Sequence, residues 1–115
     1  MDIIESNKLI AEFMDFTYEK DLGWFDSEGI LPQIVIDIND GNCFDELLFD
    51  KSWNWLMPVV EKIENLHEDC DVWFYIAGCS INYCSILFDN NCDTKLEATY
   101  ETIVEFIKWY KEHKV

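Results

Sequence analysis

Residues 94–114 read TKLEATYETIVEFIKWYKEHK, and this stretch says most about the fold. Thr94 and Glu97 have the spacing of a capping box, in which two side chains satisfy amides at the start of a helix. Three lysines near the end of the stretch suit the negative C-terminal end of a helix dipole. The stretch therefore predicts a long amphipathic helix. Its expected apolar face consists of Leu96, Tyr100, Ile103, Val104, Ile107 and Tyr110.

Residues 70–88, which read CDVWFYIAGCSINYCSILF, precede this helix and are rich in β-branched and aromatic residues. They predict one strand over 70–77 and a second over 79–88, joined at Gly78. Because side chains alternate along a strand, Trp73 and Tyr75 share the face opposite to Phe74. If helices cover only one face of the sheet, one of these two aromatic sets is exposed or meets a partner.

Two more helices are expected upstream. Asp2 and Glu5 have capping-box spacing, and apolar residues share one face, so residues 3–16 predict the first helix. Ser52 is a suitable N-cap for a second helix that reaches about residue 66. Because Pro58 has no amide hydrogen to donate to residue 54, the regular helix is expected to begin near it, after a looser turn.

Residues 34–38, IVIDI, predict a strand, residues 39–42 a turn, and residues 44–49 a returning strand. The order of elements is then helix, strands, helix, hairpin, helix. This order predicts an α+β fold in which a mostly antiparallel sheet packs with three helices as a layered sandwich. The length of 115 residues predicts a single domain over residues 1–115 with its own core.

Several helical segments carry a resemblance to a known group of proteins. They are LIAEFM at 9–14, SWNWLMPVVEKI at 52–63, EATY at 97–100 and VEFIKWY at 104–110. In these segments the chain resembles small proteins from phages and prophages of Bacteroidetes, and its layout is similar to the phage ABA-sandwich domain. The resemblance implies an origin in a mobile element and an α+β sandwich fold. It supplies no catalytic residue, because the matching segments are packing motifs.

The chain has 24 Asp and Glu residues against eight Lys and no Arg, which gives a formal charge of −16. Proteins that bind nucleic acid directly, or anionic membranes, need clustered cations, so we expect neither kind of partner. A protein with a basic surface is the partner that this charge favours. The alternative is that the charge only keeps the protein soluble.

The sequence has no apolar run near the roughly 20 residues of a membrane helix, and its start lacks the pattern of a secretory signal. We therefore expect a cytoplasmic protein, which the resemblance places in a bacterial host cell. Its five cysteines are an odd number without framework spacing, so reduced thiols are expected.

No pattern of residues indicates catalysis or a bound metal. Counted from Asp37, Gly41 falls at position five, whereas an EF-hand calcium loop needs Gly at six and Glu at twelve. Cys79 and Cys84 are offset by five and would point to opposite faces of one strand, which does not suit zinc. The chain also lacks a nucleophile elbow and a phosphate-binding loop. We expect no enzyme activity, no metal and no cofactor.

The residues expected to bind a partner are acidic and aromatic. The acidic candidates around the second predicted hairpin are Asp37, Asp40, Asp45, Glu46 and Asp50, followed by Asp21, Asp26 and Glu28. Large aromatic side chains near a surface make good interface anchors, and the candidates here are Trp24, Trp53 and Trp55. The alternative for each tryptophan is that it caps the core beneath a loop.

These residues favour a non-enzymatic interaction protein. In its most specific form this hypothesis is an anti-CRISPR-like inhibitor, which presents carboxylates to a basic nucleic-acid-binding host defence protein such as a CRISPR effector or another nuclease. The second hypothesis is a phage accessory protein that binds another protein through an aromatic sheet face, with no inhibitory role. The third is a redox- or metal-responsive protein that uses Cys79, Cys84 and Cys92.

Overall fold

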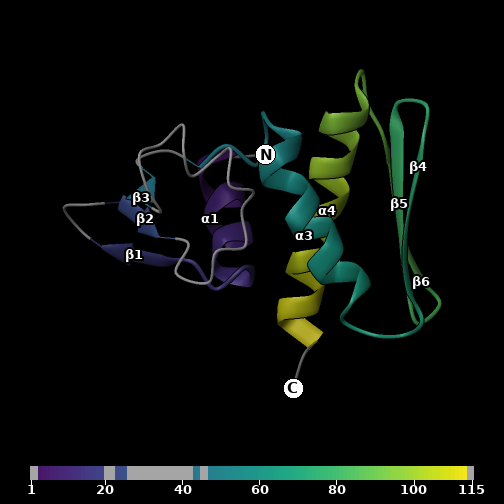
Figure 1. Ribbon diagram of the computed structural model, residues 1–115. Coiled ribbons are helices and arrows are strands. Elements are labelled where there is room, and N and C mark those ends of the chain that lie inside the picture. Colours follow the sequence, from purple (N-terminus) through teal and green to yellow (C-terminus); the bar gives the residue numbers. More distant parts are fainter. Residues whose placement is uncertain (1–2, 20–22, 26–42, 45–46, 114–115) are drawn as a thin grey trace. The chain divides into compact units, whose positions relative to one another are not determined.

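A computed structural model of the chain describes residues 3–19, 23–25, 43–44 and 47–113. The fold is α+β, with three helices and antiparallel strands in the described residues, as the sequence predicts (Figure 1). The chain divides into two compact units, an N-terminal unit, Met1–Pro58, and a C-terminal unit, Val59–Val115. The single domain expected from the length stays a prediction, and the strand expected over 34–38 lies outside the described residues.

Helix α1, Ile3–Phe13, opens the N-terminal unit and confirms the first predicted helix, although it ends three residues earlier than expected. The cause is a Schellman cap, in which Asp15 takes a left-handed conformation with φ 61°. The Phe16 amide donates to the Ala11 carbonyl, and the Asp15 amide donates to the Glu12 carbonyl. The chain then turns away from the helix axis toward the first strand.

Three short antiparallel strands follow, β1 (Thr17–Glu19), β2 (Gly23–Phe25) and β3 (Cys43–Phe44), in the order β1-β2-β3. In this sheet Tyr18 lies opposite Trp24. The strand predicted over 44–49 is wrong for residues 47–49, because the chain from Leu47 onward leads into a turn, and residues 45 and 46 lie outside the described residues. That turn is closed by the amides of Lys51 and Ser52, which both donate to the Leu48 carbonyl.

Helix α3, Trp53–Glu64, begins directly after Ser52, as the N-cap prediction requires. The looser turn expected before Pro58 is wrong, because the Trp55 and Leu56 amides already donate to the Ser52 carbonyl. Pro58 lies within the second turn of α3 and removes only the backbone hydrogen bond to the Asn54 carbonyl. The helix continues through this residue because the hydrogen bonds on either side of it remain. The division between the two units falls at this proline.

The C-terminal unit contains a second antiparallel sheet of β4 (Cys70–Tyr75), β5 (Gly78–Tyr83) and β6 (Ile86–Asn91), in that order. The single strand predicted over 79–88 is wrong, because the chain reverses at Cys84 and Ser85. Both residues have positive φ, 50° and 77°, as in a two-residue type I′ hairpin turn. Asn-Gly is the usual signal for such a turn, and Cys-Ser gives none.

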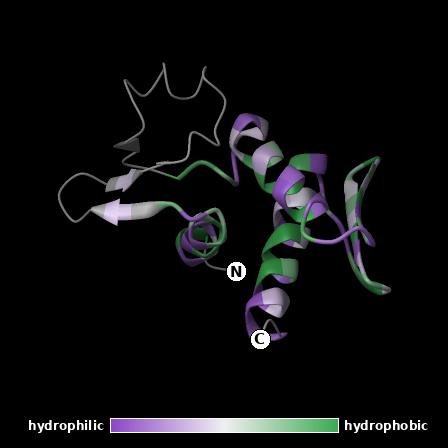
Figure 2. Cartoon of the chain, turned by 60° about the horizontal axis from the view of Figure 1, so that its bottom comes forward, coloured by the Kyte–Doolittle hydropathy of each residue, from purple (hydrophilic) through white to green (hydrophobic). Residues whose placement is uncertain are grey.

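Helix α4, Lys95–His113, confirms the helix predicted from residues 94–114. Its start is capped as expected, since the Glu97 amide donates to the Thr94 hydroxyl at 3.1 Å. It packs on one face of the sheet and lies between that sheet and the second half of α3 (Figure 1). Hydrophobic and hydrophilic residues alternate along α4 (Figure 2). Its buried side is centred on Ile103, Phe106 and Ile107.

Candidate functional site

The face of the β4–β6 sheet opposite α4 is the most distinctive surface of the described residues. The pairing register sets its side chains in three cross-strand rows, which are Asp71–Asn82–Leu87, Trp73–Ser80–Asp89 and Tyr75–Gly78–Asn91. The alternate residues of each strand point to α4, where Tyr83 and Phe88 contact the Phe106 ring. We call the surface formed by these three rows the outer sheet face.

Large apolar side chains are exposed on the outer sheet face. Trp73 is 57% exposed, Tyr75 37% and Leu87 61%. Ile76, at the tip of the β4–β5 hairpin beside Tyr75, is almost fully exposed. Since soluble proteins rarely expose neighbouring large apolar side chains without a use, this group is a candidate binding surface. The sequence predicts that one aromatic set on β4 is exposed, and Trp73 and Tyr75 are, but Phe74 on the opposite face is 37% exposed as well.

A hydrogen-bond network fixes the aromatic part of the outer sheet face. The Tyr75 hydroxyl donates to the Asp89 carboxylate, and the Ser80 hydroxyl donates to the same oxygen at 2.9 Å. These two donors, Tyr75 first, hold the pKa of Asp89 below its ordinary value of 3.8. The Tyr75 ring lies over Gly78, where an added Cβ would come within 2.0 Å of the ring. The hydrogen bonds and the contact with Gly78 therefore fix the positions of the carboxylate and the ring.

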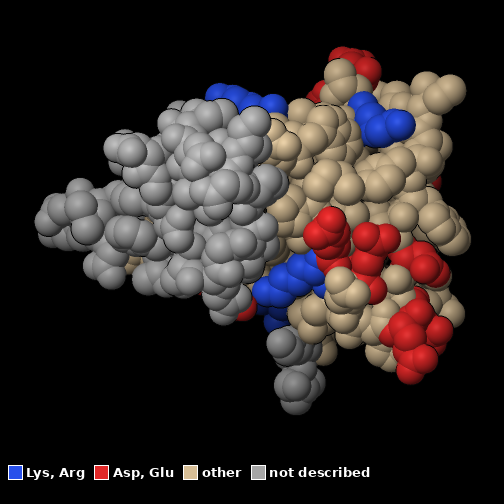
Figure 3. Space-filling model, viewed as in Figure 1, with Lys and Arg blue, Asp and Glu red and all other residues tan. Residues whose placement is uncertain are grey.

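Carboxylates dominate the charged surface of the C-terminal unit. In the view of Figure 3, acidic side chains gather over its lower part, with lysine atoms at their border. The end of the sheet near the β5–β6 turn has a shallow hollow lined by Glu68, Asp69 and Asp71. The other exposed carboxylates of this unit are Glu61, Glu64, Asp89, Asp93, Glu97, Glu105 and Glu112.

Most of the acidic residues that the sequence predicts as a binding surface lie outside the described residues, namely Asp21, Asp26, Glu28, Asp37, Asp40, Asp45 and Glu46. Asp50 is described, and it is half-buried. The side-chain amide of Asn7 donates to Asp50 Oδ1 and to the Leu47 carbonyl, both at 3.0 Å. Asp50 therefore helps to hold the 47–50 turn against α1.

The three predicted tryptophan anchors have different environments. Trp55 is only 2% exposed and packs edge-on against Phe49, with ring centroids 5.3 Å apart, so it is a core residue and not a surface anchor. Trp53, the first residue of α3, is half-exposed. Trp24 is also half-exposed and contacts Tyr18 at 5.2 Å between ring centroids. The alternative of a capped core therefore holds for Trp55.

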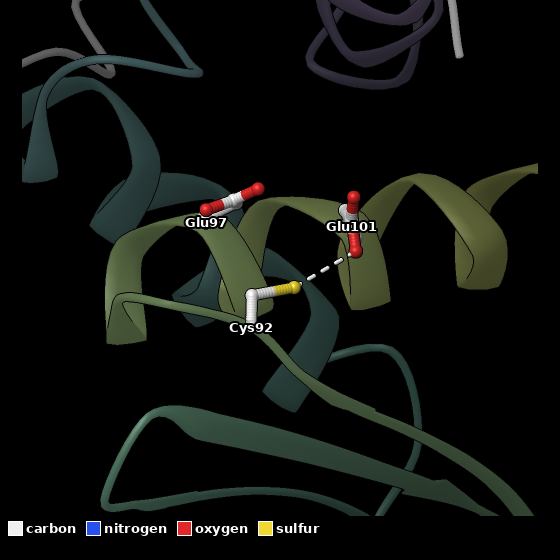
Figure 4. Close-up of side chains that lie close together, drawn as sticks. All are labelled: Cys92, Glu97 and Glu101. Atoms are coloured by element: carbon white, nitrogen blue, oxygen red, sulfur yellow. Dashed lines mark hydrogen bonds between the residues drawn. The ribbon is translucent and has the colours of Figure 1, made fainter.

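Cys92, Glu97 and Glu101 form the cluster of potential metal ligands found among the described residues, with ligand atoms within 4.8 Å of one another (Figure 4). The Cys92 thiol lies just after β6 and donates a hydrogen bond to Glu101 at 2.9 Å. That bond raises the pKa of the Cys92 thiol to about 11, so the thiol keeps its proton at neutral pH. This hydrogen bond holds Cys92 against Glu101.

The remaining described cysteines are split between the core and the surface. Burial raises the pKa of Cys70 and of Cys79 to about 11 in each case, whereas Cys84 is exposed in the β5–β6 turn. Cys79 is on the α4 side of β5, so it and Cys84 are not set side by side as ligands of one metal. The raised pKa values keep the Cys70 and Cys79 thiols protonated at neutral pH. The hypothesis of a redox- or metal-responsive protein stays a prediction.

The sequence indicated Trp73 and Tyr75 but missed Ser80 and Asp89. Those two join the site through the β5–β6 pairing, which places Ser80 opposite Asp89. The sequence predicts one unbroken strand through Cys84 and Ser85, and a single strand cannot show that its two halves pair with each other. Residues 89–91, DNN, are all polar, so no polar–apolar alternation marks the face on which Asp89 lies.

No family model, curated protein or solved structure matches this chain. The resemblance to phage proteins of Bacteroidetes therefore stays a prediction from the sequence. Within the described residues, no helix has both the length and the apolar character needed to cross a membrane.

Proposed function

We propose that the protein is a non-enzymatic binding module that holds a protein partner with a basic surface against its outer sheet face. The observation that carries the proposal is the exposure of Trp73 beside Tyr75 on a face where the charged side chains, Asp71 and Asp89, are both acidic. Exposed tryptophan and tyrosine are the side chains that most often anchor protein interfaces.

The chemistry of this face suits arginine or lysine side chains of a partner. A guanidinium or ammonium group stacks on an aromatic ring and pairs with a carboxylate beside it. Trp73 and Tyr75 supply the rings, and Asp89 supplies a carboxylate already fixed by two hydroxyl donors. The formal charge of −16 opposes a second copy of this chain and favours a basic protein.

In its most specific form the proposal is a counter-defence inhibitor. A nucleic-acid-binding host defence protein, such as a CRISPR effector or another nuclease, must carry a basic channel, and an acidic protein competes for that channel. The charge and the resemblance to phage proteins support this form, and the acidic residues between 21 and 46 remain its candidate contacts. An accessory role without inhibition is the alternative, and it uses the same sheet face.

The test is capture of a partner from bacterial lysate, its identification by mass, and titration of the purified partner with matched variants. Trp73→Ala should weaken binding by about tenfold or more, because it removes an interface anchor. Asp71→Asn should weaken it roughly two- to fivefold and flatten its salt dependence, because the lost ion pair is exposed. Glu112→Gln, near the end of α4, is the control and should bind normally.

The outcomes separate the parts of the proposal. A basic partner that binds wild type and Trp73→Ala equally well would rule out the outer sheet face. Binding that stays constant between low and high salt would rule out the carboxylate pairing and with it the mimic of nucleic acid. Loss of nuclease activity on binding would distinguish an inhibitor from an accessory protein.

A further inference from the structure

The N-terminal unit contains a cavity of about 450 Å³ where apolar and cationic side chains meet. The start of α1, the β1–β2 pair and the turn at 47–51 form its walls. Ile3, Ile4 and Tyr18, which are the large apolar side chains exposed among the described residues of this unit, all line it. The large apolar side chains that are exposed in the described part of the N-terminal unit therefore all lie at this cavity.

One wall of the cavity is aromatic. Tyr18 and Trp24 are register partners on β1 and β2, with ring centroids 5.2 Å apart and ring planes inclined by 58°. Two rings inclined in this way offer a further ring one face and one edge to contact, since ring contacts favour offset or edge-on arrangements at such distances. The wall therefore suits a ligand with a flat, unsaturated body.

The charge at this cavity differs from that of the chain as a whole. Lys8 and Lys51, the two lysines that the structure describes in the N-terminal unit, both line it. One carboxylate, Asp50, is also present, and it accepts a hydrogen bond from the buried Asn7 amide. In a chain with eight lysines and a formal charge of −16, two lysines at one apolar cavity favour an anion.

The base of the cavity is held in a fixed arrangement. The Asn7 amide bridges α1 to the Leu47 carbonyl and to Asp50, so the helix and the turn that carry the two lysines are tied together. Small-molecule sites typically have volumes of about 300–1,000 Å³, with apolar walls and a few polar groups. The size and the lining both meet this description.

We propose that this cavity binds a small organic anion with a flat apolar body, its ring against Tyr18 and Trp24 and its acidic group beside Lys8 and Lys51. An aromatic carboxylate and a nucleoside monophosphate share this chemistry. None of the residues that line this cavity is part of the outer sheet face. The proposed ligand binding can therefore be tested independently of the proposed protein binding.

In the experiment the full chain is titrated separately with 1-naphthoate, with AMP and with the neutral isostere 1-naphthamide. Binding is monitored by ¹H–¹⁵N NMR. The expected result is a saturating shift of the Trp24 indole signal and of amides near Lys8 and Lys51, several-fold weaker for the naphthamide. A lower dissociation constant for AMP than for naphthoate would assign the phosphate source, and the reverse order would assign the carboxylate source.

Matched lysine variants test the assignment without disturbing the core. Lys8→Gln and Lys51→Gln should each weaken naphthoate binding roughly two- to fivefold, as expected for exposed charge pairs. Lys108→Gln, an exposed lysine of α4, should leave binding unchanged. Trp24→Ala should weaken it by about tenfold, since it removes an aromatic contact.

Three results would overturn the proposal. The first is the absence of shifts from all three probes at millimolar concentration. The second is equal affinity for the carboxylate and the neutral amide, which would mean that the lysines contribute nothing. The third is a set of shifts on the β4–β6 sheet instead of the Tyr18–Trp24 pair, which would move the ligand to the outer sheet face.

Discussion

Asp89 shows how neighbouring residues orient a single carboxylate on the outer sheet face. Two hydroxyl groups donate to one of its carboxylate oxygens, so the charged form is favoured over the protonated form. A carboxylate that is already oriented loses little freedom when a guanidinium or ammonium group arrives, which is an advantage for affinity.

The first prediction concerns the pKa of Asp89. Because the hydroxyl groups of Tyr75 and Ser80 lower it below 3.8, the contribution of this group to stability is complete above that pH and is lost as pH falls through the lower folded value. Tyr75→Phe should move the pKa back toward 3.8. NMR titration of the Asp89 carboxyl carbon measures the pKa in wild type and in Tyr75→Phe. Equal pKa values in wild type and Tyr75→Phe would contradict this account.

The second prediction concerns Cys92. Glu101→Gln should lower the pKa of the thiol from about 11 toward its ordinary value of 9.0, because the carboxylate that holds the proton is gone. Brief treatment with iodoacetamide at pH 8, followed by peptide mass mapping, should show alkylation of Cys92 about tenfold faster than in wild type. Glu105→Gln, one turn further along α4, should have no such effect. An unchanged rate in Glu101→Gln would show that the hydrogen bond does not control this thiol.

At the scale of the elements, the β5–β6 hairpin is the least conventional feature. Its turn holds Cys84 and Ser85 at positive φ, a conformation that costs a residue with a side chain roughly 1 kcal/mol. The hairpin nevertheless forms, because Ile81 and Phe88 pair on the α4 side and bury apolar surface. Tertiary packing overrides the local preference here.

The third prediction follows from this turn. Replacing Cys84 and Ser85 together by Asn and Gly should raise the free energy of unfolding by about 1 kcal/mol, because those residues adopt a type I′ turn readily. Urea unfolding should show a higher midpoint with an unchanged slope. Asn91→Gly, within β6, is the matched control and should destabilise instead. A double variant no more stable than wild type would mean that the turn is not strained.

The elements also show what the sequence could and could not reveal. Thr94 and the helical spacing after it identified α4, since capping and periodicity act locally. Pro58 misled the prediction for α3, because the cost of one lost hydrogen bond is small when neighbouring bonds and apolar burial remain. The alternation on β4 revealed Trp73 and Tyr75. The sequence could not predict the position of Asp89, because that position depends on the pairing of β5 with β6. The turn that sets this pairing, at Cys84 and Ser85, lacks the usual turn residues.

At the scale of the whole molecule, charge is the dominant property. The formal charge of −16 over 115 residues means that acidic side chains repel one another in any compact state. Packing of the apolar residues, centred in the C-terminal unit on Ile81, Ile103 and Phe106, must offset this repulsion. The folded protein should therefore respond to ionic strength even without a partner.

The fourth prediction concerns this response. Raising sodium chloride from about 20 mM to 500 mM should stabilise the fold, because salt shortens the range of repulsion between exposed carboxylates. An effect on the order of 1 kcal/mol corresponds to a rise in Tm of about 4 °C for a chain of this size. Thermal unfolding by circular dichroism measures it, and potassium chloride should act alike. A constant or falling Tm would show that self-repulsion is negligible.

The Tyr75 ring over Gly78 has an evolutionary consequence. Because a Cβ at position 78 would collide with that ring, any homologue with a larger residue at 78 must move or lose the aromatic side chain at 75. Positions 75 and 78 should therefore covary, although they lie on facing strands. Homologues that keep both residues should keep the outer sheet face, whereas those without the aromatic ring at 75 are free to carry a side chain at 78.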